Sequence, residues 1–146
     1  MSEIAVISEN VKVIVFQLMG KEYAIPVSQV RSIEKVQHIT RVPKAAPFVK
    51  GVINLRGVVT PVIDLRIRFS LPEDVHSEDT RVIIAGVNDK EVGLVVDAAN
   101  DVLDIPSEAI ESQPEVVGAV EADYISGVAK LEKRLLVLLN LEEVLN

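Results

Sequence analysis

Side chains that could perform acid or base chemistry are few and poorly grouped in this sequence of 146 residues. His38 and His76 are the natural proton shuttles near neutral pH, but both lie in polar, loop-like stretches without a nucleophile or carboxylate at a suggestive spacing, and we expect them to be solvated. Asp97, Asp101 and Asp104 form a cluster, yet paired carboxylates catalyse only where a cleft raises one pKa, and spacing alone does not reveal a cleft. We therefore predict no catalytic residue and no enzyme activity.

Metal and phosphate sites have equally weak support. The chain contains no cysteine, which excludes disulfides, thiolate catalysis and cysteine-ligated zinc. The acidic stretch 71–80, LPEDVHSEDT, could hold a divalent cation weakly, but its composition is more typical of a solvated linker. Gly51 and Gly57 do not form a phosphate-binding loop, because no Lys-Ser or Lys-Thr pair follows them. The sequence predicts no metal and no cofactor.

Composition limits the classes of partner. A net charge of −7 and an aromatic content of 3% argue against nucleic-acid binding, which uses basic grooves and stacking platforms. The hydrophobic content of 49% supports a real core of branched aliphatic side chains, as one domain or as two small subdomains. Neither a signal-peptide pattern nor an apolar window of roughly 18 to 20 residues occurs, so we expect a soluble, cytoplasmic protein without membrane insertion. A small β-barrel enzyme and a nucleic-acid-binding barrel remain the alternatives to a protein-recognition module.

The stretch FVKGVINLRGVVTPVIDLRIRF, residues 48–69, is the part of the chain that the rest is organised around. The apolar runs Val49–Leu55 and Val58–Leu65 predict a hairpin, and Gly57 supplies the positive φ that its turn needs. Pro61 donates no backbone hydrogen bond, which places its strand at a sheet edge or at a bulge. The turn presents Arg56, either as a recognition group or as an ordinary solubilising charge.

Further hairpins and turns follow from the same kind of pattern. Alternating apolar runs separated by short polar turns predict hairpins, and proline-led polar segments predict single helical turns. The predicted hairpins pair 11–19 with 22–27, 81–87 with 91–96, and 125–131 with 134–140 around Glu132-Lys133; another strand covers 98–105; helical turns follow residue 27 and lie within 106–113 and 141–146.

The two halves of the chain resemble each other. Without gaps, GVINLRGVVTPVIDL from Gly51 aligns with GVAKLEKRLLVLLNL from Gly127, with Asp64 opposite Asn140. We infer one domain over 1–146, built from two tandem β-barrels of about five strands each, since closed barrels protect such apolar strand edges. Their predicted bounds are 11–70 and 80–141, joined by the acidic linker 71–79 and followed by a C-terminal turn at 142–146.

The central motif also resembles a known family. Gly51 to Gly57, GVINLRG, continued by Pro61 to Leu65, PVIDL, is similar to the signature of the CheW-like chemotaxis coupling proteins. The resemblance extends in order over nearly the whole chain, through 22–25 with 30–34, 91–97, and 124–125 with 127–128. Because no kinase or receiver segment is attached, the chain is more similar to the stand-alone coupling proteins than to the regulatory domain of the chemotaxis kinase.

The resemblance implies an all-β fold of two SH3-like barrels and a non-catalytic adaptor. Such an adaptor bridges the cytoplasmic tip of a chemoreceptor to the histidine kinase CheA, is monomeric alone, and is recruited to receptor arrays at the membrane. It implies receptor contacts at Val27, Val30, Ile33 and Arg56, with Gly51 and Gly57 shaping the hairpin, and kinase contacts at Gly93, Val95, Asp97 and Ala99. Each of these valines could equally be ordinary core.

Two positions depart from the family pattern. The family often has a larger apolar residue after the aspartate of the second barrel, where this chain has Ala98-Ala99. Its last hairpin often turns on Asp-Gly, where Glu132-Lys133 stands here. Neither departure touches the NLRG hairpin.

Overall fold

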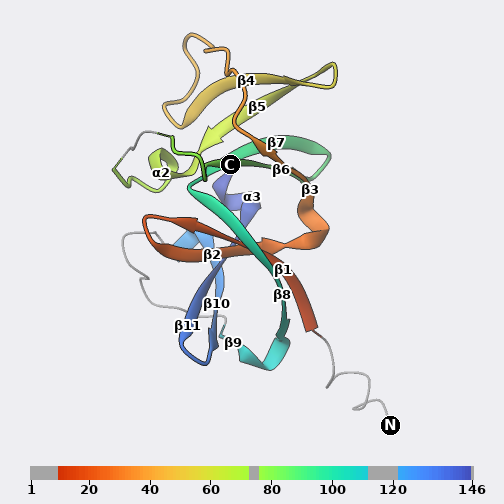
Figure 1. The fold of residues 1–146 in the computed structure, drawn as a ribbon, viewed down its shortest axis with the longest axis vertical. Coiled ribbons are helices and arrows are strands. Elements are labelled where there is room, and N and C mark those ends of the chain that lie inside the picture. Colours follow the sequence, from red (N-terminus) through yellow and green to blue (C-terminus); the bar gives the residue numbers. More distant parts are fainter. Residues whose placement is uncertain (1–9, 73–75, 112–121, 146) are drawn as a thin grey trace.

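The structure of the chain, a computed structural model, describes residues 10–72, 76–111 and 122–145. Strands dominate and form two twisted sheets that lie one above the other in Figure 1, with short helical turns in the connections and α3 (Leu141–Val144) between the sheets. The predicted all-β fold, with two small barrel-like units and helical turns in the connections, is confirmed. The turns are η1 (Val27–Gln29), α2 (Leu65–Arg68), η2 (Ser107–Ala109), η3 (Ala122–Tyr124) and α3 (Leu141–Val144).

Each sheet has its own strand order. The five-stranded sheet runs β3-β6-β7-β5-β4 and the six-stranded sheet runs β8-β1-β2-β11-β10-β9. The first contains β3 (Val30–Lys35), β4 (Val49–Leu55), β5 (Val58–Asp64), β6 (Arg81–Val87) and β7 (Lys90–Val96). The second contains β1 (Asn10–Leu18), β2 (Lys21–Pro26), β8 (Ala98–Pro106), β9 (Ile110–Glu111), β10 (Ile125–Leu131) and β11 (Arg134–Leu139). Every predicted hairpin is present as an antiparallel pair.

The division of the chain into barrels at 11–70 and 80–141 does not describe how the strands pair. β1 and β2 join strands of the second half, while β6 and β7 join strands of the first half. Two parallel ladders, β11 with β2 and β5 with β7, make these exchanges. The barrel bounds predicted from the sequence were therefore wrong, because each half contributes its first hairpin to the other half's sheet.

The acidic stretch has a different place from the one predicted. Its described residues, 71–72 and 76–79, connect α2 to β6, and the strands on either side of it, β5 and β6, both belong to the five-stranded sheet. It is a surface connection within one unit and does not link two barrels. The predicted C-terminal turn is confirmed as α3, which begins at Leu141.

Three apolar clusters hold the molecule together. One cluster lies inside each barrel-like unit, and the largest lies between the two sheets. In this largest cluster the aromatic rings form a row, with Phe16 against Tyr23, Tyr23 against Phe69, and Phe69 against Tyr124. Alternate residues of β1 serve different clusters: Val13 and Val15 face the interior of the six-stranded unit and Ile14 and Phe16 face the space between units. A strand buried on both faces reads as a continuous apolar run, which explains the composition of this segment.

Pro61 is placed differently from the prediction. β5 is an internal strand, with β4 on one side and β7 on the other, and the register shift lies in β4 between Val49 and Gly51. The ladder with β7 begins only at Val62, so Pro61 precedes it and has a paired strand on one side alone. The missing N–H therefore costs no ladder hydrogen bond with β7.

The helical turn α2 was not predicted. Asp64 begins it, accepting hydrogen bonds from the backbone N–H groups of Arg66 at 2.9 Å and Ile67 at 3.4 Å. Asn140, its counterpart in the sequence repeat, begins α3 by accepting from Glu143 N–H. The guanidinium of Arg68 then joins the two helical turns, donating to the Val144 carbonyl at 2.7 Å. A carboxylate or amide at the end of a strand was the available signal for both turns.

Candidate functional site

The turn between β4 and β5 presents Arg56 to solvent. Arg56 and Gly57 both have positive φ, 51° and 87°, and the Asn54 side chain accepts a hydrogen bond from Gly57 N–H at 2.8 Å. A turn with two positive φ angles matches the twist of the hairpin. The Arg56 side chain is 71% exposed, and Val58 and Val59 beside it are 56% and 65% exposed. The tip therefore combines a guanidinium with apolar side chains.

Gly51 fixes the base of this hairpin. A Cβ placed on Gly51 would lie 2.1 Å from the Thr40 carbonyl oxygen. Thr40 passes so close because it exchanges two backbone hydrogen bonds of 2.8 Å with Val52. Gly51 therefore permits the segment after β3 to run alongside β4 and close this side of the unit. Gly57, in contrast, has open space around it and is needed for its φ angle.

The predicted apolar contacts lie at the junction of the two units. Val27 and Val30 are partly buried and pack against the cluster between the sheets, so the interpretation of these valines as core side chains applies to most of their surface. Ile33 is 42% exposed and lines a shallow hollow of about 100 Å³ with Ile14, Ala99, Asp101 and Val102. Val102 is 57% exposed at its rim. The sequence patterns did not single out Val102, whose only signal is an apolar residue within the polar face of a strand.

The stretch with the predicted kinase contacts divides into buried and accessible residues. Gly93 and Val95 are buried, and a Cβ on Gly93 would lie 2.8 Å from Val82 Cγ1 in the interior of the five-stranded unit. Neither residue offers a side chain to a partner in this structure. Asp97 is half-buried, and Ala99 lies with Ile33 in the junction hollow, apart from the other residues of its predicted group.

Asp97 fastens three elements to one another. Its carboxylate accepts from Arg66 Nε at 3.0 Å and Nη2 at 2.5 Å, and from Met19 N–H at 2.8 Å in the β1–β2 turn. Burial alone would raise its pKa, but the hydrogen bonds from Arg66 and Met19 and the charge of Arg66 hold the pKa of Asp97 below its usual value. Asp97 thus fixes the turn that exposes Met19, which is 46% exposed.

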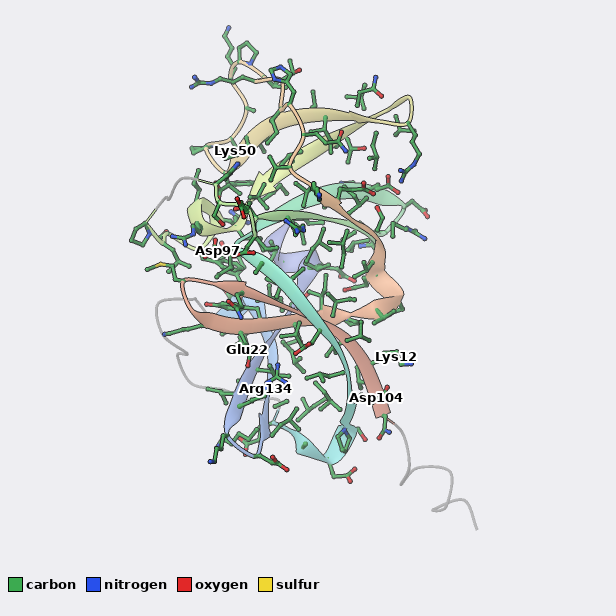
Figure 2. All side chains as sticks on the ribbon, in the orientation of Figure 1. Lys12, Glu22, Lys50, Asp97, Asp104 and Arg134 are labelled. Carbon is green, nitrogen blue, oxygen red and sulfur yellow. The ribbon has the colours of Figure 1, made fainter. Side chains whose placement is uncertain are left out.

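A second carboxylate–guanidinium group lies on the six-stranded unit. Arg134 donates to both carboxylate oxygens of Glu22, at 3.0 and 2.7 Å, and reaches Asp101 at 3.2 Å; Figure 2 shows Arg134 directed toward Glu22. The hydrogen bonds from Arg134 lower the pKa of Glu22. The group ties β11, β2 and β8 together, and no sequence pattern indicated it because its members are distant in the chain.

The described residues offer little support for a metal site or for acid–base chemistry. No three side chains of His, Cys, Asp and Glu gather there as metal ligands would. His38 is exposed as expected, whereas His76 is half-buried with Nε2 lacking a hydrogen-bond partner among the described residues. Within the same residues, no helix is long and apolar enough to cross a membrane.

Similarity to known proteins agrees with the motif and the fold. A family model, the CheW-like domain, matches residues 12–146. The chain is 51% identical to the chemotaxis protein CheW of Bacillus subtilis over 142 residues, covering 97% of this chain and 91% of that protein, and 36% identical to that of Klebsiella aerogenes, covering 91% and 80%. The crystal structure of the scaffolding protein TtCheW from Thermoanaerobacter tengcongensis superposes with a TM-score of 0.85 at 32% identity, covering 90% of each chain. This chain belongs to the CheW-like family.

Proposed function

We propose that this protein is a non-catalytic adaptor that couples the cytoplasmic tip of a chemoreceptor to the histidine kinase CheA. The proposal rests on family membership and on the presence of two accessible surfaces in separate parts of the molecule. In this role the protein is cytoplasmic and is recruited to receptor arrays by its partners. By holding receptor and kinase together it raises their effective concentration and fixes their relative geometry.

The observation that carries the receptor side is the position of β3. Ile33 on this strand lines the junction hollow, and the next residue, Glu34, lies 3.6 Å from Arg56 at the hairpin tip. β3 therefore contributes to both features, with Ile33 and Glu34 projecting to opposite faces of the strand. A receptor tip that packs a helix into the hollow would bury apolar side chains at Ile33 and Val102, and a polar group elsewhere on the same tip would reach Arg56. We assign Ala99 to this receptor surface because it shares the hollow with Ile33.

The kinase side is assigned to the β1–β2 turn. Asp97 holds this turn through Met19 N–H, and the exposed Met19 side chain stands beside it. Gly93 and Val95 support the strand from within and act through packing. A flexible apolar methionine on a fixed turn suits a protein interface, where Met is enriched.

The first test is a co-sedimentation assay with a receptor tip fragment and CheA. Arg56→Glu is expected to weaken receptor binding about tenfold or more while kinase binding is unchanged. Lys133→Glu, which reverses a charge at the tip of the other unit's hairpin, is the matched control and should leave both contacts intact. Thermal stability should hardly change with Arg56→Glu, because the Arg56 side chain is largely solvated. A large fall in melting temperature would make Arg56 a structural residue.

The kinase side is tested in the same assay with Met19→Glu. Leu135→Glu is its control, because Leu135 and Met19 are both 46% exposed. Met19→Glu is expected to reduce kinase binding about tenfold and leave receptor binding unchanged. If wild type binds neither partner, the fold is conserved without the coupling function.

A further inference from the structure

Arg56 has a neighbour that limits what it can bind. Glu34 approaches it from β3, with Oε2 3.6 Å from Arg56 Nη2. This separation is too long for a hydrogen bond, so the two side chains form a loose ion pair. Arg56 makes no side-chain hydrogen bond within the described residues, and its guanidinium donors are available to a partner.

Glu34 is held more firmly than Arg56. The side chain of Glu34 is 20% exposed, against 71% for Arg56. Glu34 lies opposite Val82 in the pairing of β3 with β6, and Val82 belongs to the interior cluster of the five-stranded unit. Because directly paired residues project to the same face of a sheet, the Glu34 side chain leaves the strand on the interior side. Its carboxylate therefore stays near the hairpin tip while Arg56 adapts to a ligand.

This arrangement has a consequence for the chemistry of the partner. A carboxylate that bound Arg56 would also approach the carboxylate of Glu34, and like charges repel most strongly where water is partly excluded. A carbonyl or amide oxygen would accept from the same guanidinium without that repulsion. The last carbonyl groups of a helix are such acceptors, because they lack partners within the helix.

We propose that Glu34 is a specificity-determining residue, which makes Arg56 select an uncharged oxygen acceptor, such as a carbonyl at a helix end or a side-chain amide, over a carboxylate. The inference rests on the proposed receptor contact and states the chemistry of that contact. The partner group at Arg56 is then a neutral part of the receptor tip, and acidic residues of the tip lie elsewhere.

The test uses the full chain and a set of receptor tip fragments. The probe is the parent helical-hairpin fragment together with variants in which each uncharged polar residue of its tip is replaced in turn by Glu. Each fragment is titrated against wild type, Glu34→Gln and Glu108→Gln. Glu108 is an exposed carboxylate on η2 of the other unit, so its replacement removes the same charge at a remote place.

The expected result is a rescue at one position. At the fragment residue that meets Arg56, Glu weakens binding to wild type about tenfold, and Glu34→Gln restores it whereas Glu108→Gln does not. The restored binding weakens between about 50 mM and about 300 mM salt, as an ion pair should. With the parent fragment, Arg56→Gln lowers affinity by a similar factor at both salt concentrations, as expected for a neutral acceptor.

Two results would overturn the inference, and both can be distinguished from a result that contradicts the proposed function. One is the absence of any fragment position that Glu34→Gln rescues. The other is a loss caused by Arg56→Gln that disappears at high salt with the parent fragment, which would identify a carboxylate partner. If the parent fragment does not bind wild type, the receptor contact itself is wrong, and this inference fails with it.

Discussion

The hairpins β4–β5 and β10–β11 have similar backbones, but their arginines differ in exposure and in ion pairing. Each hairpin has a register shift next to a glycine, Gly51 or Gly127, and each leads into a helical turn that a polar side chain begins. Each second strand forms a parallel ladder with a strand from the other half of the chain. On the first hairpin Arg56 points to solvent in a loose pair, whereas on the second Arg134 is fastened to Glu22 and Asp101.

The difference separates recognition from stability on one repeated scaffold. An exposed, weakly paired guanidinium retains its donors for a partner, and a guanidinium in a bidentate pair has used them within the protein. The helical turns differ in the same way: α2 carries Arg66, which binds Asp97, while α3 carries Glu142 at the matching position. The two repeated segments therefore share a backbone conformation, and their charged side chains determine whether each one stabilises the fold or is available to a partner.

Replacing the glycines at the two register shifts is expected to give the largest stability losses, and it tests whether the two hairpins are equivalent. Gly51→Ala is expected to destabilise the protein by about 3 kcal/mol or more, because the new Cβ would meet the Thr40 carbonyl, a backbone atom that cannot move alone. Gly127→Ala should cost less, about 1 to 2 kcal/mol, since its Cβ would lie 2.9 Å from the Ile110 side chain and 3.0 Å from the Glu111 carbonyl oxygen, farther than the 2.1 Å at Gly51. Urea denaturation of both variants measures the difference. Equal losses would show that the two positions are equivalent.

Asp97 provides a test of intermediate size. Asp97→Asn is expected to cost about 1 to 2 kcal/mol at neutral pH, because Arg66 loses its charged partner at a partly solvated site. The folded-state pKa of Asp97 is lowered, so its contribution is present above the unfolded pKa of about 4 and is lost as pH falls through the folded pKa. Wild type should therefore lose more stability than Asp97→Asn when the pH is lowered below about 4.

Denaturation as a function of pH, from neutral to acidic, measures this effect. The pKa of Glu22 is lowered too, so a smaller acid-induced loss remains in the Asp97→Asn variant. Parallel stability curves for wild type and Asp97→Asn would contradict the assigned role of Asp97.

The two arginines give the smallest stability effects and the sharpest contrast. Arg134→Gln should lower the free energy of unfolding by about 1 kcal/mol, because its bidentate pair with Glu22 is only partly exposed. Arg56→Gln should change it by about 0.3 kcal/mol or less, since surface pairs with poor geometry contribute little. Melting temperatures of the two variants, recorded side by side, measure the contrast. Equal shifts in melting temperature would contradict the distinction between Arg134 as a stabilising residue and Arg56 as a residue available to a partner.

Most of the local structure could be predicted from the sequence, although α2, β9 and η3 could not. The four hairpins, β8 and the turn after residue 27 follow from alternation of apolar residues and from turn residues within a few positions of one another. The exposed Arg56 and the positive φ of Gly57 follow from the same short stretch. The family signature, which lies in that stretch, identified the fold.

Only the tertiary structure decided which strands share a sheet. β1, β2, β6 and β7 have similar apolar patterns, so nothing in their composition states that each hairpin pairs with the opposite half. That exchange buries Gly93 and Val95 and brings Ile33 beside Ala99, although the family resemblance predicts these two residues on different surfaces. The sequence by itself determined the hairpins, their turns and the side chain at each tip, because these depend on neighbouring residues. The parallel ladders and the junction hollow depend on contacts between distant strands, which a pattern of period two cannot distinguish.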